Sequence, residues 1–183
     1  MANTYFLIQG YTLGSDVTGD ISFTSIPQTY THLIFSISAR SGQAGAIDDL
    51  RIIINNNTSA TYTNIRMYAE FASGSFIVGQ DGGSSSGATS NNYIGALQGN
   101  GASANTFAGE ELFIPNYTTN FLKNGYSDSS AQNNSTAASN WIRQIGTIRT
   151  SDTAPITSIQ LRSYNNTTMI TGSTLFLYGL AST

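Results

Sequence analysis

The side chains able to carry acid–base chemistry are few in this sequence of 183 residues. His32 is the single histidine, and it stands at the start of an apolar segment. A catalytic triad or a histidine metal site would need partners that the fold brings to it from elsewhere, because geometry and not residue type defines such sites. We therefore expect His32 to be structural.

Two adjacent carboxylate pairs, Glu110-Glu111 and Asp48-Asp49, are the candidates for glycosidase chemistry. Neighbouring residues of a strand point to opposite faces of its sheet, so neither pair converges on one substrate. A pair drawn from two different segments, such as Glu110 with Asp48, stays open at this point. We predict that the protein is not an enzyme, and we assign no catalytic residue.

A possible calcium site is the segment from Asp16 to Asp20, in which two carboxylates flank a turn at Gly19. Carboxylate oxygens suit calcium, and an Asx turn explains the same pattern, so both interpretations stay open. The Gly82-Gly83 pair lacks the following lysine of a phosphate-binding loop, and the absence of cysteine removes thiolate ligands and disulfides. We assign no metal-binding residue and predict no cofactor.

Composition limits the partners of this chain. Only 9% of the residues are charged, against a usual share of about a quarter, and Ser, Thr, Asn and Gly supply the polarity instead. Neutral polar groups tolerate burial when they are hydrogen-bonded, so such a surface can pack closely against other subunits. Seven Lys and Arg face ten acidic residues, with no basic cluster, and we expect no nucleic-acid partner.

The beginning of the chain shows no targeting signal. It has no basic n-region, and the apolar run at Tyr5–Ile8 is too short for the core of a signal peptide. No segment approaches the roughly 18 apolar residues of a membrane helix. We expect a soluble protein made without a signal peptide and without a membrane partner.

Short segments rich in β-branched and aromatic residues, separated by Gly, Asn, Asp and Ser, predict an all-β fold. The length suits one domain over residues 1–183. We predict an antiparallel β-sandwich, with strands at 4–8, 31–39, 50–55, 65–71, 75–78, 92–97, 111–115, 141–150, 157–163 and 174–180.

Apolar periodicity assigns faces to several of these strands. Alternation predicts one buried face in the segments Leu33–Ile37 and Ile159–Leu161. The continuous run Arg51–Ile54 predicts a strand covered on both faces, or one at a subunit contact. In the last strand, Leu175 and Leu177 should face one side and the equally apolar Phe176 and Tyr178 the other.

Composition predicts connections or turns in several segments. Asn-rich clusters at 55–59 and 165–168 predict hairpin connections. The Gly- and Ser-rich stretch 79–87 predicts an exposed loop. A helical turn is expected to follow Ser127–Ala131, where Asp and Ser are good N-caps and Ala-rich residues come next.

An ordered series of motifs carries a resemblance to a known class of proteins. The series runs from Glu110–Tyr117, which holds Ile-Pro-Asn-Tyr, through Trp141 and the Ile-Thr-Ser-Ile segment of 154–161, to the Leu-Tyr-Gly ending of 172–180. Leu50–Tyr62 adds an Asn-rich turn followed by a tyrosine. In this order the motifs resemble structural proteins of tailed bacteriophages, especially phages of aquatic bacteria.

The resemblance implies a virion component with a jelly-roll-like β-sandwich and no enzymatic activity. Small β-sandwich proteins of this kind resemble capsid decoration, or cement, proteins. We therefore expect a protein of the head surface that binds the major capsid protein and copies of itself, as a homotrimer. The alternative is a tail-fibre or tail-tip module for host surface glycans, favoured by the ten tyrosines and the predicted loop around 81–87. No binding residue is assigned.

Overall fold

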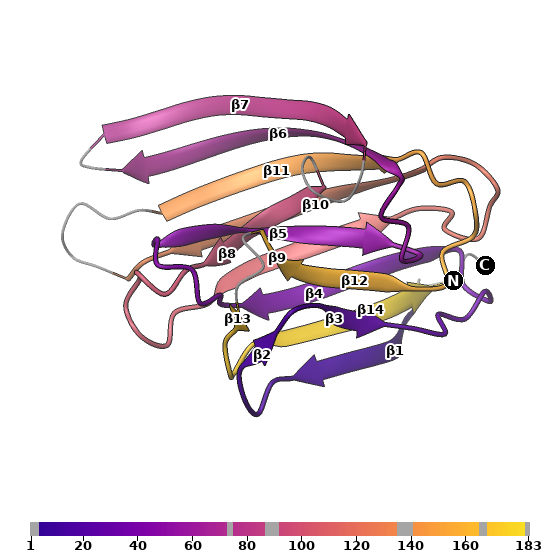
Figure 1. Cartoon of the computed structure of the whole chain (residues 1–183), viewed down its shortest axis with the longest axis horizontal. Helices are drawn as coiled ribbons and strands as arrows, with labels where there is room; N and C mark the ends of the chain where they lie inside the picture. Colours follow the sequence, from indigo (N-terminus) through magenta and orange to yellow (C-terminus); the bar gives the residue numbers. More distant parts are fainter. Residues whose placement is uncertain (1–3, 73–74, 87–91, 135–140, 165–167, 182–183) are drawn as a thin grey trace.

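Two antiparallel sheets of unequal width, stacked face to face, form the fold of this chain (Figure 1). The computed structural model describes residues 4–72, 75–86, 92–134, 141–164 and 168–181. Within these ranges no residue is helical, and no helix long enough to cross a membrane occurs. The predicted all-β antiparallel sandwich is confirmed.

The wide sheet has eight strands and the narrow sheet has four. In spatial order the wide sheet contains β1 (Tyr5–Thr12), β14 (Thr174–Leu180), β4 (His32–Ala39), β9 (Ala108–Ile114), β10 (Lys123–Gln132), β11 (Trp141–Thr150), β6 (Thr61–Ala72) and β7 (Ser75–Ser86). The narrow sheet contains β3 (Ile21–Phe23), β12 (Ile159–Ser163), β5 (Ile47–Ile54) and β8 (Tyr93–Gln98). A short pair, β2 (Val17–Thr18) with β13 (Thr168–Met169), lies apart from both.

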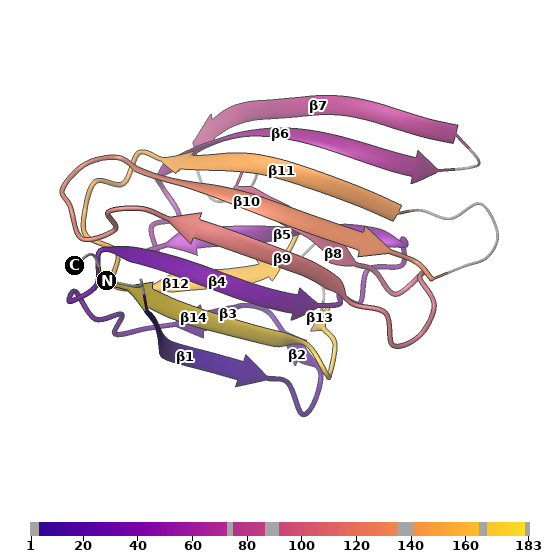
Figure 2. The same ribbon diagram turned by 180° about the vertical axis from the view of Figure 1, so that it is seen from behind.

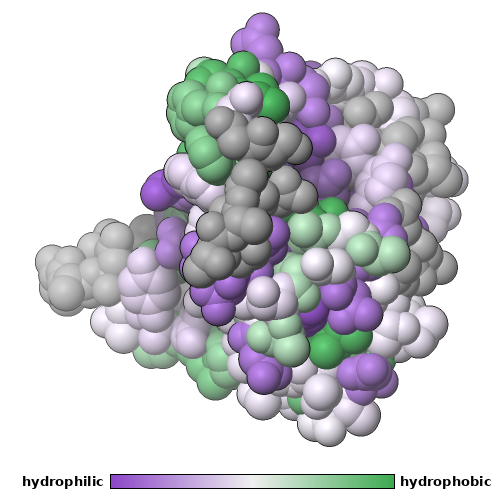
Figure 3. All heavy atoms as spheres, turned by 90° about the vertical axis from the view of Figure 1, so that its left-hand side faces the viewer, coloured by the Kyte–Doolittle hydropathy of each residue, from purple (hydrophilic) through white to green (hydrophobic). Residues whose placement is uncertain are grey.

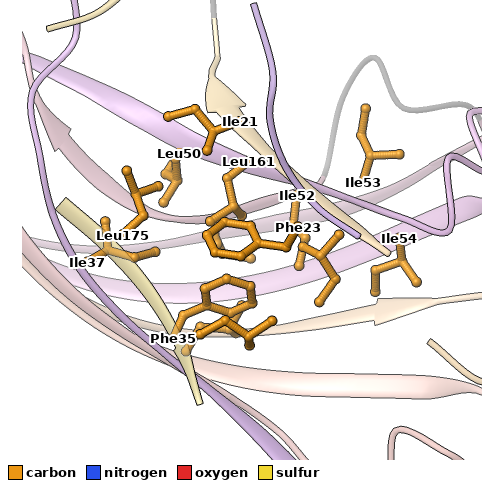
Figure 4. Close-up of a cluster of buried hydrophobic side chains, with 14 of the residues drawn as sticks. Ile21, Phe23, Phe35, Ile37, Leu50, Ile52, Ile53, Ile54, Leu161 and Leu175 are labelled. Atoms are coloured by element: carbon orange, nitrogen blue, oxygen red, sulfur yellow. The ribbon is translucent and has the colours of Figure 1, made fainter. Parts of the chain in front are cut away.

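The hydrophobic core lies between the narrow sheet and strands β14, β4 and β9 of the wide sheet. Leu33, Phe35, Leu175 and Leu177 are fully buried there. Phe35 meets Phe23 of the narrow sheet edge to face, with ring centroids 5.0 Å apart (Figure 4). This geometry suits aromatic pairs, and it joins the two layers at the centre of the core.

The predicted faces agree with the observed burial. Leu175 and Leu177 point into the core, whereas Phe176 and Tyr178 lie half-buried on the other side of β14. In β5, Ile52, Ile53 and Ile54 are all buried within the single chain. The continuous run therefore marks a strand covered on both faces, the first of the two alternatives.

The helical turn expected after 127–131 falls largely on residues 135–140, outside the described residues, but its expected capping segment and the predicted loop at 79–87 are strand. Residues 127–131 lie in β10, where Ser127 donates a hydrogen bond to the carbonyl of Ile94 and Ser129 accepts one from the N–H of Ala96 at 3.1 Å. The hydroxyls thus bond to β8 across the layers instead of capping a helix. Residues 79–86 of the predicted loop belong to β7, and only Gly87 lies outside the described residues.

Glycines permit the close approach of β7 to its neighbour β6. A Cβ added at Gly79 would lie 2.4 Å from the ring of Tyr68, and one added at Gly82 would lie 2.5 Å from the carbonyl oxygen of Asn64. The loop prediction from composition is therefore wrong, because these glycines allow two strands to approach closely and do not mark a flexible loop.

The Asn-rich segment 55–59 forms a turn, with positive φ at Asn55 and Asn56. It does not connect a hairpin, because β5 and β6 belong to different sheets, so that part of the prediction is wrong. The turn carries the chain from one layer to the other. The hydroxyl of buried Tyr62 holds it by accepting a hydrogen bond from the N–H of Ile54 at 2.9 Å. The second predicted hairpin falls largely on residues 165–167, outside the described residues.

Two buried cations organise loops at the ends of the sandwich. The Lys123 ammonium donates to the carbonyls of Thr119, Phe121 and Thr153 at 2.5 to 2.9 Å. Burial lowers the pKa of this lysine. The Arg40 guanidinium donates to groups of the segment 100–106, including the carbonyls of Ser103 and Ala102. Each cation therefore satisfies several loop carbonyls at once.

Replacing Tyr62 by Phe tests the hydrogen bond that joins the layers. Tyr62→Phe keeps the ring but leaves the buried N–H of Ile54 without its acceptor. We expect a loss of about 1–3 kcal/mol in the free energy of unfolding, measured by urea denaturation. Tyr126→Phe, at an exposed ring, is the control and should change it by less than about 0.5 kcal/mol. Equal effects of the two substitutions would contradict the assigned role.

Candidate functional site

The candidate site is the outer face of the wide sheet, the side that points away from the narrow sheet. In Figure 2 this face is turned to the viewer, and no strand of the described chain lies in front of it. The strand registers place side chains from all eight strands on it. A sheet of this width usually buries one face and hydrates the other, so the residue types on this face are informative.

A row of large side chains crosses the middle of the outer face. Tyr178, Ile34, Phe113 and Tyr126 lie opposite one another on β14, β4, β9 and β10. The rings of Phe113 and Tyr126 have centroids 5.1 Å apart. Cross-strand aromatic pairs of this kind stabilise a sheet, and here they do so on a face that no described element covers.

An apolar groove of about 520 Å³ continues this row across β10, β11 and β6. Its walls include Tyr126, Ile145, Ile65 and Met67, and each of these side chains is more than half exposed. A contiguous group of large exposed apolar side chains is unusual for a monomer and marks surfaces that contact another molecule.

At the middle of β6 and of β11, the pattern of burial is inverted relative to an ordinary sandwich. In β6, the polar Asn64 is 2% exposed on the inner side, whereas Ile65 is 62% exposed on the outer face. In β11, Gln144 is 4% exposed and Ile145 is 51% exposed. At these positions polar side chains face inward and apolar ones face outward, the reverse of what folding of one chain alone favours, whereas Tyr62 and Ile148 of the same two strands are buried in the core.

A polar hollow of about 350 Å³ borders the groove. It is lined by residues that include Glu111, Asp128, Ser130 and Arg143, and Arg143 pairs with Asp128 at 2.5 Å. Trp141, which is 41% exposed, lines a neighbouring hollow together with Arg143. The outer face therefore offers an apolar area with a charged and hydrogen-bonding margin.

The β6–β7 hairpin carries the apolar surface to the edge of the sheet. Phe76 and Val78 are exposed on the outer face, and Ile77 is exposed on the opposite side of β7. The view onto that end of the molecule shows hydrophobic atoms gathered at its upper part (Figure 3). Both faces of this hairpin are thus available for contact.

His32 lies on the outer face in a structural setting. Its Nδ1 accepts a hydrogen bond from the N–H of Asn116 at 3.1 Å, and its ring centroid lies 5.2 Å from that of Phe113. The side chain holds the turn after β9 and packs on an aromatic ring, which agrees with the structural role expected from the sequence.

The adjacent carboxylates separate as predicted. Glu111 points to the outer face, whereas Glu110 lies between the layers with 6% exposure and no hydrogen-bond partner for either oxygen among the described residues. Burial, and next the charge of Asp49, raise the pKa of Glu110 well above its ordinary value.

The carboxylates of β5 are also engaged within the fold. Buried Asp48 accepts a hydrogen bond from the hydroxyl of Ser163 at 2.6 Å. Asp49 pairs with Arg66 at 2.6 Å, although burial still raises its pKa. Glu110 and Asp48 are therefore both buried, each with 6% exposure.

The two carboxylates of the possible calcium site have separate partners. Asp16 accepts a hydrogen bond from the N–H of Thr171 at 2.8 Å, and Asp20 lies 3.5 Å from Arg162. Gly19 between them has a φ of 98°. Within the described ranges, no group of three or more His, Asp or Glu side chains is arranged to hold a metal ion. This geometry favours the turn interpretation.

Comparison with known proteins adds no assignment: no protein-family model matches the chain, and no curated protein matches it significantly. The outer face itself was missed by sequence reasoning. The signal was present in β6, where Ile65 and Met67 alternate with Asn64 and Arg66. From alternation alone, however, Ile65 and Met67 would be predicted to face the core.

The buried carboxyl of Glu110 predicts a pH-dependent stability. Its raised pKa means that the folded chain keeps a proton which the unfolded chain releases above about pH 4.5. The contribution of this group is therefore most favourable below that pH and declines as the pH rises toward the folded pKa, by up to about 1.4 kcal/mol per pH unit.

Glu110→Gln should remove this decline, because glutamine stays neutral. In urea denaturation at pH 4 to 8, we expect the variant to gain stability over the parent as the pH rises. Glu111→Gln, at the exposed neighbour, should follow the parent curve. If Glu110→Gln keeps the full pH dependence, the assignment of the buried proton to Glu110 is wrong.

Proposed function

We propose that this chain is a non-enzymatic structural protein of a bacteriophage virion, and that it decorates the capsid by docking the outer face onto the head shell. The observation that carries the proposal is the inverted pattern of β6 and β11, in which Ile65 and Ile145 are exposed and Asn64 and Gln144 are buried. Apolar side chains held outward on a rigid sheet stabilise a contact with another protein more than they stabilise the single chain.

The distribution of charge supports a protein partner. Six of the seven Lys and Arg side chains are engaged inside the chain: Arg40, Arg51, Arg66, Lys123, Arg143 and Arg162. Cations that bind loop carbonyls, carboxylates or rings are not arranged to neutralise a run of phosphates. A surface with an apolar centre and a polar rim is the usual anatomy of a protein–protein interface.

In this role the protein acts by bridging. A rigid face that contacts two neighbouring capsid subunits adds binding free energy to the closed shell, so their separation becomes less favourable and slower. The homotrimer expected from the sequence belongs to the same proposal, because cyclic closure limits open-ended association. The motif series ending in Leu-Tyr-Gly supplies the association with phages, and the outer face supplies the means of attachment.

Location and copy number in purified particles test the proposal. We expect hundreds of copies per particle by mass spectrometry, and antibody labelling over the head in electron micrographs. A few copies confined to the tail would refute a decoration role.

The contribution of the outer face is tested separately with shells that lack the protein. Ile145→Lys places a charge in the apolar groove and should weaken binding to such shells about tenfold or more. Thr29→Lys, in an exposed loop, is the matched control for added charge and should bind as the parent does. Equal binding of the two variants would exclude the groove from the contact.

The polar hollow supports a second candidate, a tail module that binds host surface glycans. Trp141 and Tyr126 are exposed near Glu111, Asp128 and Arg143, and sugar recognition combines aromatic rings with such hydrogen-bonding groups. The loop that first favoured this function is strand up to Ser86, which weakens that part of its motivation. A glycan array decides: binding that Trp141→Ala abolishes would support the candidate, and an array without binding would remove it.

A further inference from the structure

We propose that β7 of one copy pairs antiparallel with β7 of a second copy, about a two-fold axis at Gln80. The pairing would join two wide sheets edge to edge. It concerns a different surface from the outer face and does not depend on the virion role, so the two proposals can fail independently.

β7 is an open edge of the wide sheet. It ends the strand order of the wide sheet, and its twelve residues pair with β6 along their whole length without a register shift (Figure 1). The outward edge of such a strand presents regularly spaced backbone donors and acceptors, which are a template for another strand. Residues 75–78 are all exposed.

β7 also lacks the features that protect edge strands from pairing. Natural edges carry lysine, proline, bulges or unpaired inward charges. β7 has no lysine, arginine or proline, and its one charge, Asp81, is neutralised by Arg66 through contacts of 2.5 and 2.9 Å. β7 therefore has none of these features to prevent pairing with another strand.

The other edges of the described sheets are different. β1, at the far end of the wide sheet, has a register shift between Leu7 and Gln9 that interrupts its regular spacing. In the narrow sheet, β3 has only three residues, and the pairing of β8 with β5 shifts between Leu50 and Arg51. Among the described strands, β7 is the long and regular edge.

The side chains in the two halves of β7 are complementary in size. Phe76, Ile77 and Val78 fill its first half, whereas Gly82, Gly83 and Ser84 fill its second half. Antiparallel pairing about Gln80 places Phe76 opposite the second copy's Ser84, and Val78 opposite the second copy's Gly82. Each bulky side chain then covers a small residue across the joint, as aromatic side chains do for edge glycines in sheets.

The charge of Asp81 favours the register with the axis at Gln80 over the registers with the axis at Asp81 or at Gly79. An axis at Asp81 would set two carboxylates directly opposite, which is unfavourable. An axis at Gly79 would set Ile77 opposite the second copy's Asp81. The axis at Gln80 sets each Asp81 opposite a glycine and brings together two neutral amides, which can hydrogen-bond to each other.

The pairing has a consequence for the outer face. A two-fold axis between antiparallel edge strands stands perpendicular to the sheet, so both outer faces lie on the same side. The apolar surface of each copy, from Tyr126 to Val78, then continues into that of the second copy. If the proteins are trimers held by other surfaces, the same edge would join neighbouring trimers.

Cysteine cross-linking of the full chain tests the register, because the parent has no cysteine. Under mild oxidation, Gln80→Cys should form a disulfide-linked dimer on a denaturing gel. Phe76→Cys and Ser84→Cys should each stay largely uncrosslinked alone and form a dimer when mixed. Phe121→Cys, exposed in a loop, is the control for random collision.

Several results would overturn the proposal. If Gln80→Cys cross-links no faster than Phe121→Cys, β7 does not pair with itself. If the mixture of Phe76→Cys and Ser84→Cys gives no more dimer than either variant alone, the register is wrong. In sedimentation of cysteine-free protein, Val78→Lys should weaken self-association at least tenfold while the circular dichroism spectrum is unchanged, and equal association would also contradict pairing at this edge.

Discussion

A four-stranded sheet stacked on an eight-stranded one can cover only part of one face. This difference in width determines where the hydrophobic core lies and which surfaces of the wide sheet stay uncovered. Where the narrow sheet lies over β14, β4 and β9, the contact is a hydrophobic core built from residues such as Phe23 and Phe35. Toward β10, β11 and β6 the space between the layers also holds buried polar side chains, such as Asn64, Ser129 and Gln144, beside the apolar Tyr62 and Ile148. The wide sheet thus has a core half and, where these polar groups are buried, a polar half, and no described strand covers its outer face.

The polar half is held by β8, whose backbone is satisfied across the layers. Ser127 and Ser129 bond to Ile94 and Ala96, and Arg66 pairs with Asp49 while its guanidinium lies over the ring of Tyr93. Gly95 leaves room for the Glu110 side chain, because an added Cβ would lie 2.2 Å from one of its carboxylate oxygens. The buried acid thus lies against the backbone of β8, where a charged form would be strongly disfavoured. Hydrogen bonds and the Arg66–Asp49 ion pair thus contribute to this half, whereas apolar packing holds the other.

The sequence predicted those parts of the fold where apolar periodicity and burial agree. Leu33–Ile37, Ile159–Leu161 and Leu175–Leu177 were assigned correctly because each has one face in the core. Prediction failed in β10 and β7, since serine and glycine there serve contacts with β8 and β6 that are distant in sequence. It also failed at the Asn-rich turn, whose local conformation was right but whose two strands join different sheets. No local pattern distinguishes a hairpin from a crossing between layers.

The low charge of the chain is compatible with close packing of several copies. With most cations used internally and a net charge of −3, neighbouring copies repel one another weakly even when they are close together. An apolar outer face and an undefended edge would be hazards for a protein that works as a free monomer, because they invite unspecific association. They become consistent with each other when the chain works in an ordered array, where the face and the edge each meet a fixed partner. The same features that make this fold a poor isolated monomer therefore favour an assembled one.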